Sequence, residues 1–128
     1  MLDPQAQALM QLMVEKGVPP VNTLSPAEAR ASYRSRRTFT QPDAPHVFKV
    51  EDKVFSANGV NVPVRVYHPQ AAQTQTALPG LVYLHGGGWT IGDLDTHDVL
   101  CRSLCVQADA IVVSVDYRMG PEQKFPAA

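Results

Sequence analysis

A short apolar run that ends in three consecutive glycines constrains the fold of this chain more than any other stretch. Residues 81–84 read Leu-Val-Tyr-Leu, and residues 85–89 read His-Gly-Gly-Gly-Trp. An apolar run of this length predicts a buried strand. Glycine loses more backbone freedom on folding than other residues, so three in succession indicate a sharp turn or a close approach of the backbone to another group. Residues 90–98 lead into an amphipathic segment, which predicts the order strand, glycine loop, helix.

The predicted loop suits an anion, because successive N–H groups with no Cβ in the way can point at one oxygen atom. A phosphate loop of the Walker type requires Lys-Ser or Lys-Thr after its last glycine, whereas Trp89-Thr90 follows here. A dinucleotide-binding loop has spaced glycines, and these are contiguous. A His-Gly-Gly-Gly run after a strand does match the oxyanion loop of lipases and esterases. For the tetrapeptide alone, a tight turn without chemistry stays open as the alternative.

Composition argues against several other classes of protein. The 128 residues suffice for one domain with a sizeable core, and 45% hydrophobic with 18% charged residues is ordinary for a globular protein. A net charge of −1 gives no electrostatic reason to expect a nucleic-acid or anionic-membrane partner. No apolar run approaches the roughly 18 residues that a membrane-spanning helix requires. The first residues lack the basic region and apolar core of a signal peptide, so we expect a cytoplasmic protein.

The two cysteines predict neither a metal site nor a redox pair. Cys101 and Cys105 lie four residues apart within a predicted helix, a spacing that matches no zinc or dithiol motif. Their side chains would lie parallel on one helix face, which disfavours a disulfide. We therefore expect two buried, reduced thiols that pack as small hydrophobic groups. We expect no metal and no other cofactor.

The first 45 residues predict two helices and a polar linker. Asp3 can cap a helix that begins at Pro4. The apolar stripe of this helix contains Ala6, Leu9, Met10, Met13 and Val14. Ser25-Pro-Ala-Glu is a capping-box pattern for a second helix, which we expect to reach about Arg37. The basic residues of that helix predict a solvated face; they are Arg30, Arg34, Arg36 and Arg37.

The middle of the chain predicts an antiparallel hairpin. Residues 47–55 are a first strand, and Asn58-Gly59 is a strong signal for a two-residue hairpin turn. In residues 60–67 valines alternate with other residues, which is the period-two pattern of a half-buried strand. Pro63 lacks a backbone donor and favours an edge or near-edge position for this strand. Residues 70–77, rich in Ala, Gln and Thr, predict a loop.

The last part of the chain predicts a parallel βαβ unit. Asp95 or Thr96 can cap a helix that runs to about Ala108. The residues of this helix that we expect to face inward are Val99, Leu100, Leu104 and Val106. Residues 111–115 form an unbroken apolar strand of the kind found in sheets that are covered on both faces. The whole order predicts an α/β fold with an antiparallel start, and residues 126–128 look like the first turn of a further helix.

Several motifs in a fixed order make a resemblance to one family specific. They are residues 85–89 (HGGGW), 92–98 (GDLDTHD), 115–118 (VDYR), 121–122 (PE) and 124–128 (KFPAA). Together they resemble the N-terminal part of bacterial carboxylesterases in the hormone-sensitive-lipase-like branch of the α/β hydrolases. The likeness covers the whole chain. It implies that residues 1–45 form part of a helical cap and that residues 46–128 form the first part of an α/β-hydrolase core.

The resemblance implies a role for each residue of the glycine loop. The N–H groups of Gly87 and Gly88 would stabilise the oxyanion of a tetrahedral intermediate, with Gly86 shaping the turn. His85 would hold the loop by hydrogen bonding and would not act as a base, because it precedes the glycines at the end of the strand. Trp89 would line the pocket of a short or medium acyl ester, and packing beneath the loop is an equal alternative for it.

The resemblance also implies that essential residues lie beyond Ala128. Ester hydrolysis in this family requires a serine in a Gly-x-Ser-x-Gly elbow, followed by an acid and a histidine. None of the serines in this chain has glycines in that arrangement. We therefore expect the triad beyond residue 128, and we expect the 128 residues alone to hydrolyse no ester. Small departures from the family pattern, at Met119-Gly120 and Gln123, touch no catalytic residue.

Two functions of other classes stay open. One is a non-catalytic small-molecule receptor, since gibberellin receptors resemble this family and keep the glycine loop. The other is an inactive fragment that binds another chain through an exposed strand. In α/β hydrolases the strand before the glycine loop pairs with the strand that carries the nucleophile, so residues 81–84 would otherwise be an open edge. We expect the remainder of the hydrolase chain, or self-association, to cover that edge.

Overall fold

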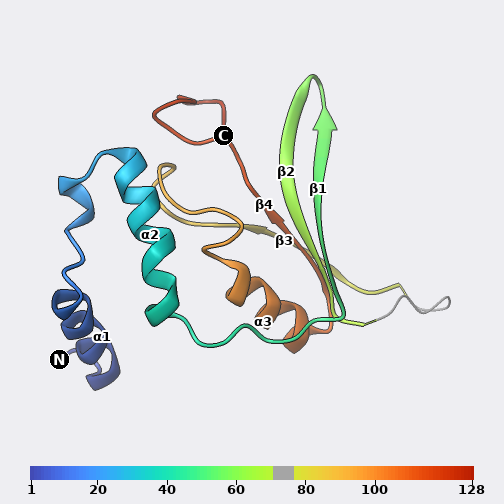
Figure 1. The fold of residues 1–128 in the computed structure, drawn as a ribbon. Coiled ribbons are helices and arrows are strands. Elements are labelled where there is room, and N and C mark those ends of the chain that lie inside the picture. Colours follow the sequence, from blue (N-terminus) through green and yellow to red (C-terminus); the bar gives the residue numbers. More distant parts are fainter. Residues whose placement is uncertain (71–76) are drawn as a thin grey trace.

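The computed structural model describes residues 1–70 and 77–128, which form three α-helices and one four-stranded sheet (Figure 1). The elements in chain order are α1 (Pro4–Glu15), the 3-10 turn η1 (Val21–Thr23), α2 (Pro26–Thr40), β1 (Lys49–Ala57), β2 (Val60–His68), β3 (Gly80–Leu84), α3 (Asp98–Ala108) and β4 (Ile111–Val115). The predicted α/β class and the order hairpin, strand, helix, strand are confirmed. Most of the loop predicted at residues 70–77 lies outside the described residues.

The four strands form a mixed sheet in the order β1-β2-β4-β3. β1 and β2 form an antiparallel hairpin, in which Asn58 and Gly59 have the positive φ angles that a two-residue turn of this type requires. β2 pairs antiparallel with β4, and β3 pairs parallel with β4. The near-edge position predicted from Pro63 is confirmed, because β2 lies next to the edge strand β1. Within the described residues, β3 is the other edge of the sheet.

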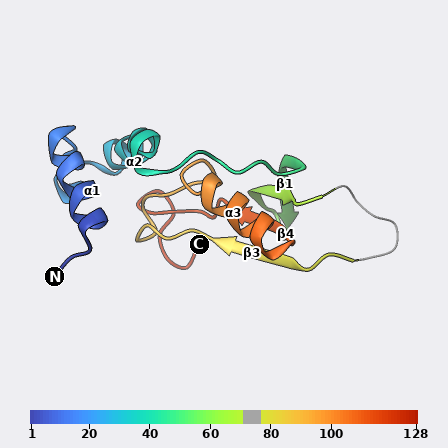
Figure 2. The same ribbon diagram turned by 90° about the horizontal axis from the view of Figure 1, so that it is seen from below.

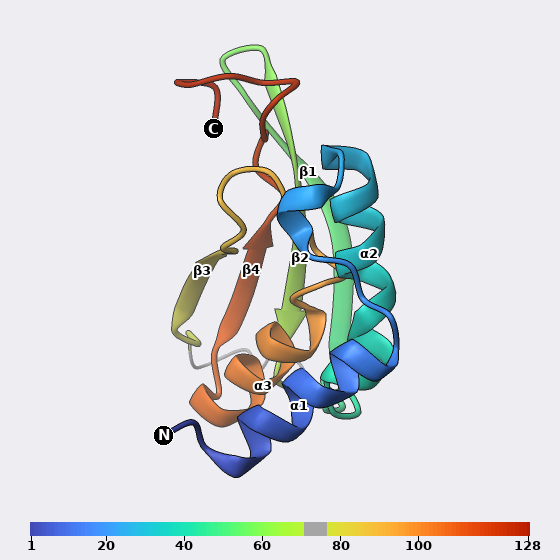
Figure 3. The same cartoon turned by 90° about the vertical axis from the view of Figure 1, so that its left-hand side faces the viewer.

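One face of the sheet is covered by α3, and the core lies between them (Figure 3). Tyr67 and Val112 of the sheet, with Cys101 and Cys105 of α3, are fully buried. Both cysteines are free thiols, so the prediction of buried, reduced cysteines is confirmed. Burial raises the pKa of both thiols. They therefore stay protonated near neutral pH and pack as apolar groups.

The opposite face of the sheet is apolar and is not covered by any helix among the described residues. Its side chains line a shallow hollow of about 370 Å³; they are Phe55, Val62, Val64, Val82, Val113 and Val115. Val82 is 68% exposed and Leu84 is 64% exposed. The sequence predicted a sheet covered on both faces. In residues 1–70 and 77–128 only one face is covered, because α1, α2 and α3 all lie on the same side of the sheet (Figures 1 and 3).

α3 differs from its prediction in the face that it buries and in its start. Leu100 and Val106 were expected to face inward, yet they are 45% and 48% exposed, because Cys101 and Cys105 occupy the centre of the buried face. The residue before the helix is His97, which replaces the predicted caps.

The true start of α3 is explained by a turn that precedes it. The backbone N–H of Asp93 donates to the Thr96 hydroxyl at 2.8 Å, and the N–H of Thr96 donates to the Asp93 carboxylate at 2.7 Å. These reciprocal bonds use the Thr96 side chain, so it cannot cap α3. Asp95, the other predicted cap, accepts a bond from Arg65 instead. Residues 126–128 form no helix in this structure.

The N-terminal helices begin where the sequence predicts. The Asp3 carboxylate accepts a hydrogen bond from the Gln5 N–H, and Ser25 and Glu28 form the complete capping box of α2. α2 ends at Thr40, three residues beyond the expected end at Arg37. The apolar stripe of α1 is not buried. α1 lies on the side of α2 that faces away from the sheet (Figure 2). The division into a cap at residues 1–45 and a core at 46–128 stays a prediction.

No helix in residues 1–70 or 77–128 combines the length and apolar character that crossing a membrane requires.

Candidate active site

The glycine loop follows β3 directly and has a conformation that requires glycine. Gly87 and Gly88 have φ angles of +135° and +59°, which residues with a side chain rarely adopt. A Cβ atom added at Gly87 would lie 1.8 Å from the carbonyl oxygen of Ile91. The loop closes on itself there, because the N–H groups of Thr90 and Ile91 donate to the Gly87 carbonyl oxygen at 3.1 and 3.0 Å.

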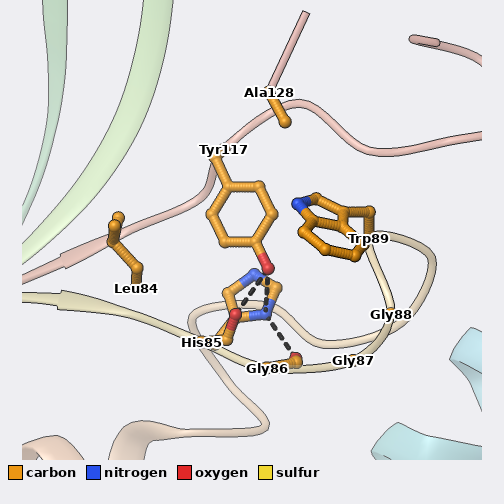
Figure 4. A pocket seen from close by; sticks show the side chains of 8 residues that line it. All are labelled: Leu84, His85, Gly86, Gly87, Gly88, Trp89, Tyr117 and Ala128. Carbon is orange, nitrogen blue, oxygen red and sulfur yellow. Dashed lines mark hydrogen bonds between the residues drawn. The ribbon is translucent and has the colours of Figure 1, made fainter. Parts of the chain in front are cut away.

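The N–H groups of Gly87 and Gly88 have no hydrogen-bond acceptor among the described residues. They belong to the wall of a pocket of about 330 Å³ at the carboxyl end of β3. The residues that line it are Leu84, His85, Gly86, Gly87, Gly88, Trp89, Tyr117 and Ala128 (Figure 4). All five predicted site residues therefore lie together. Trp89 is 68% exposed, and its indole ring faces the pocket opposite Leu84.

His85 lies beneath the loop, where it is 3% exposed. Its Nδ1–H donates to the carbonyl oxygen of Gly86 at 2.9 Å, which fixes the proton on Nδ1 because a carbonyl can only accept. The imidazole stacks on the Tyr117 ring, with centroids 4.4 Å apart, and on the His97 ring at 5.3 Å. Its Nε2 is buried and has no partner among the described residues. The ring is thus clamped between two aromatic groups.

Tyr117 and Gly92 belong to this site, and the sequence analysis gave them no role. The Tyr117 hydroxyl donates to the backbone carbonyl of His85. A Cβ atom at Gly92 would lie 2.4 Å from Nδ1 of His85, so only glycine leaves room for that ring. A signal for Tyr117 was present: it follows β4 as His85 follows β3, and the carboxyl ends of adjacent parallel strands meet at one edge of the sheet.

The charged groups around the site are partly buried and shift one another's pKa values. Burial would raise the pKa of Asp93, but hydrogen bonds from Arg34 and Thr96 outweigh this and lower it. Burial lowers the pKa of His97, and the neighbouring His85 adds to that effect. Burial raises the pKa of Asp116, with Asp93 as a second cause. Near neutral pH the site therefore contains a neutral His97 and an ionised Asp93.

The basic run on α2 is only in part the solvated face that the sequence predicted, because the exposed Arg34 and Arg37 and the half-buried Arg30 also bind groups near the site. Arg30, Arg34 and Arg37 lie at positions i, i+4 and i+7, which places them on one side of the helix. Arg30 contacts the glycine loop, Arg34 forms an ion pair with Asp93, and Arg37 donates to the carbonyl oxygen of residue 95 at 2.8 Å. The helical spacing was a signal for a shared face, but the partners lie about 60 residues away in the chain.

Within residues 1–70 and 77–128 no group of His, Cys, Asp or Glu side chains suits a metal ion.

Comparison with known proteins connects this geometry with a family. A family model described as the alpha/beta hydrolase fold matches residues 81–128, which include the glycine loop, α3 and β4. The solved structure of an ester hydrolase from the metagenome of Lake Arreo, in complex with a derivative of bipyridine phosphonate, superposes on 99% of this chain. Its TM-score is 0.86 and its sequence identity is 35%. This chain belongs to the α/β hydrolases.

Other α/β hydrolases show the same relationship. A hyperthermophilic esterase from the archaeon Pyrobaculum calidifontis superposes on 99% of this chain, with a TM-score of 0.82 and 32% identity. The carboxylesterase NlhH of Mycobacterium tuberculosis is 45% identical over 98 residues, or 76% of this chain. The ethyl acetate hydrolase of Pseudomonas putida is 35% identical over 99% of it.

The chain spans less than half the length of these α/β hydrolases. It covers 41% and 40% of the two solved structures, 30% of the mycobacterial carboxylesterase and 42% of the ethyl acetate hydrolase. The two solved structures and the ethyl acetate hydrolase each match 99% of this chain, so these three alignments include α1 and α2 with the sheet. The likeness therefore extends to α2, the helix that contacts the glycine loop.

Proposed function

We propose that this chain supplies the oxyanion-binding loop of a serine carboxylic ester hydrolase of the hormone-sensitive-lipase-like branch. The substrates would be esters with short or medium acyl chains. The serine, acid and histidine of the triad would lie beyond residue 128, which is consistent with the share of the related esterases that the chain covers. In this proposal the 128 residues bind the developing negative charge and contribute no nucleophile.

The observation that carries the proposal is the pair of N–H groups at Gly87 and Gly88. Both residues line a pocket, and neither N–H has an acceptor among the described residues. Gly87 is half-buried and Gly88 is exposed, so both donors are accessible from the pocket. Two adjacent N–H groups without a protein acceptor suit a ligand that accepts hydrogen bonds. The loop is held by bonds to the Gly87 carbonyl, so its donors are oriented before any ligand arrives. Preorganised donors of this kind stabilise an oxyanion with little reorganisation.

The other predicted site residues have supporting roles in this proposal. His85 holds the loop through the Gly86 carbonyl and cannot serve as a general base, because its ring is buried between two aromatic groups. Trp89 forms an apolar wall for the acyl or alcohol group, and Gly86 begins the turn. The rest of the hydrolase chain, or a second copy, would pair with the open edge of β3.

Kinetics of the complete natural polypeptide that contains this chain would test the proposal. We expect it to hydrolyse 4-nitrophenyl acetate and butyrate. Gly87→Ala should lower kcat by roughly a hundredfold or more, because the added Cβ displaces the loop and its donors. Gly80→Ala is the matched control, because a Cβ at that position meets no atom within 4 Å and the φ angle is not left-handed; its kcat should change less than about twofold.

Two results would count against the proposal. The first is a complete polypeptide whose mass and peptide sequence show no Gly-x-Ser-x-Gly elbow, or an elbow without a later histidine, which would favour a receptor. The second is equal ester hydrolysis by the wild type and the folded Gly87→Ala variant, which would leave the glycine loop without a catalytic role.

A further inference from the structure

Arg30 of α2 contacts the glycine loop at the Thr90–Ile91 peptide group, whose N–H closes the loop by donating to the Gly87 carbonyl. Its Nε–H donates to the carbonyl oxygen of Thr90 at 2.7 Å. The guanidinium is fixed by a second bond to the Gly120 carbonyl at 2.7 Å and by two bonds to the Glu122 carboxylate at 2.8 Å. Only 23% of the Arg30 side chain is exposed. These charge-assisted bonds fix the orientation of the guanidinium and stabilise its positive charge.

Two peptide groups connect this cation with the donor at Gly88. The Thr90 carbonyl, which accepts from Arg30, belongs to the same planar peptide group as the Ile91 N–H. That N–H donates to the Gly87 carbonyl at 3.0 Å. The Gly87 carbonyl in turn shares its peptide group with the N–H of Gly88, a residue that lines the pocket. Hydrogen bonds linked in this way polarise one another, so a cation at one end strengthens the donor at the other.

A second series of bonds ends at the same carbonyl oxygen. The Gly120 N–H donates to the Trp89 carbonyl at 2.8 Å, and the Thr90 N–H of that same peptide group donates to the Gly87 carbonyl at 3.1 Å. The carbonyl of Gly120 accepts from Arg30. Arg30 therefore binds the Thr90 carbonyl directly and also binds residue 120, whose N–H donates to the neighbouring Trp89 carbonyl.

We propose that Arg30 is a positioning residue for the oxyanion site, which orients the Gly87–Gly88 peptide group and strengthens the Gly88 N–H as a donor. This inference rests on the proposed function, because the oxyanion is the one that ester hydrolysis would generate. Arg30 acts through the peptide groups, since its guanidinium is bonded to the outer side of the loop and does not line the pocket. Arg37 lies on the same helix face but contacts residue 95, outside the glycine loop.

NMR of the complete polypeptide tests the inference without relying on turnover. The matched variants are Arg30→Met and Arg37→Met, because each removes one cation and its bonds to a loop carbonyl from the same face of α2. In Arg30→Met we expect the amide proton of Gly88 to shift upfield, as a weaker donor does when its peptide group loses polarisation. In Arg37→Met the Gly88 signal should stay at its wild-type position.

Kinetics provide the second readout. Arg30→Met should lower kcat for a short aryl ester roughly tenfold, less than the loss of an oxyanion donor outright, and KM should change less than about twofold, because the effect grows with charge in the transition state. Arg37→Met should keep the wild-type kcat.

Arg30 could affect the loop in two ways: through its bond to the Thr90 carbonyl, or by joining α2 to the segment at residues 120–122. The variant Glu122→Gln distinguishes these two explanations. This variant weakens the Arg30–Glu122 pair and leaves the bond from Arg30 to Thr90 in place. We expect the Gly88 signal and kcat to stay near their wild-type values. If Glu122→Gln reproduces the changes of Arg30→Met, the connection between α2 and residues 120–122 accounts for the effect and the inference is overturned.

The two proposals fail in different ways. An unchanged Gly88 signal in folded Arg30→Met overturns the role of Arg30, whether or not the protein hydrolyses esters. A shifted Gly88 signal in a protein without esterase activity supports the role of Arg30 in holding the loop and overturns the proposed function instead.

Discussion

Gly92 is the residue on which the position of the His85 ring depends. A Cβ at Gly92 would lie 2.4 Å from Nδ1 of His85 and 2.7 Å from the Gly86 carbonyl oxygen, at a φ angle of +102°. Gly92→Ala should therefore lower the free energy of unfolding by about 1–3 kcal/mol, through backbone strain and displacement of the ring. Urea unfolding measures this value. Gly80→Ala, where the added Cβ meets no neighbouring atom, should be close to neutral; an equal loss in both variants would contradict the argument.

His97 should make stability depend on pH. Burial holds its pKa below the ordinary value of 6.5, so the unfolded chain takes up a proton before the folded chain does. Stability from this residue is fully present above about pH 6.5 and is lost as the pH falls through the lower, folded-state pKa. The contribution of Asp116 to the pH dependence of stability has the opposite sign. Burial raises its pKa in the folded state, so protonation of this carboxyl as the pH falls favours the folded state.

The measurement for His97 is urea unfolding at several pH values between about 7.5 and 5.5. The wild type should lose stability across this range. His97→Asn keeps a polar side chain of similar reach and removes the titration, so its stability should change less over the same range. A slope in the variant as steep as in the wild type would show that another group controls the pH dependence.

At the scale of elements, the capping box at the start of α2 is the clearest case of local control. The Glu28 carboxylate accepts from the N–H and hydroxyl of Ser25, at 2.9 and 2.6 Å. Ser25→Ala should destabilise the protein by about 1 kcal/mol, because it removes the cap of exposed N–H groups. Ser35→Ala in the middle of the same helix removes only a bond to the carbonyl of Ser32, and should have a smaller effect in urea unfolding. Equal losses would show that the capping box adds nothing to α2.

The elements that could be predicted from the sequence are those set by neighbours in the chain. The caps at Asp3 and Ser25, the hairpin at Asn58-Gly59 and the glycine turn after β3 all follow from residues within a few positions of one another. The start of α3 could not be predicted in this way, because Thr96 has two possible partners and bonds to Asp93 instead of the helix.

The contacts of the candidate site were harder to predict, because they depend on which segments meet in space. The glycines were found from their own pattern, but the arginines of α2 bind groups that are 58 to 92 residues away. The need for glycine at position 92 follows from where the His85 ring lies, and no local pattern records that. Oxyanion binding itself stays a prediction until the variants of Gly87 are measured.

At the scale of the whole molecule, the open edge of β3 and the uncovered apolar face predict association of the 128-residue chain. We expect its sedimentation coefficient to rise with protein concentration, because exposed strand edges pair with one another. Val82→Lys places a charge on the edge strand, at a residue that is 68% exposed, and should shift the equilibrium toward monomer. Val54→Lys adds the same charge on β1, the opposite edge, and is the matched control. A monodisperse monomer at all concentrations would contradict this prediction.

The contacts of α2 with the glycine loop also bear on the order of events during protein synthesis. The groups that hold this loop, from Arg30 to Glu122, all precede residue 128 and so leave the ribosome before the proposed triad residues. N-terminal segments of a growing chain can fold before later ones are made. In a hydrolase of the proposed kind, the anion-binding half of the active site would therefore be assembled before the nucleophile is translated. Until then, the nascent chain would expose the β3 edge and depend on chaperones to keep it from pairing wrongly.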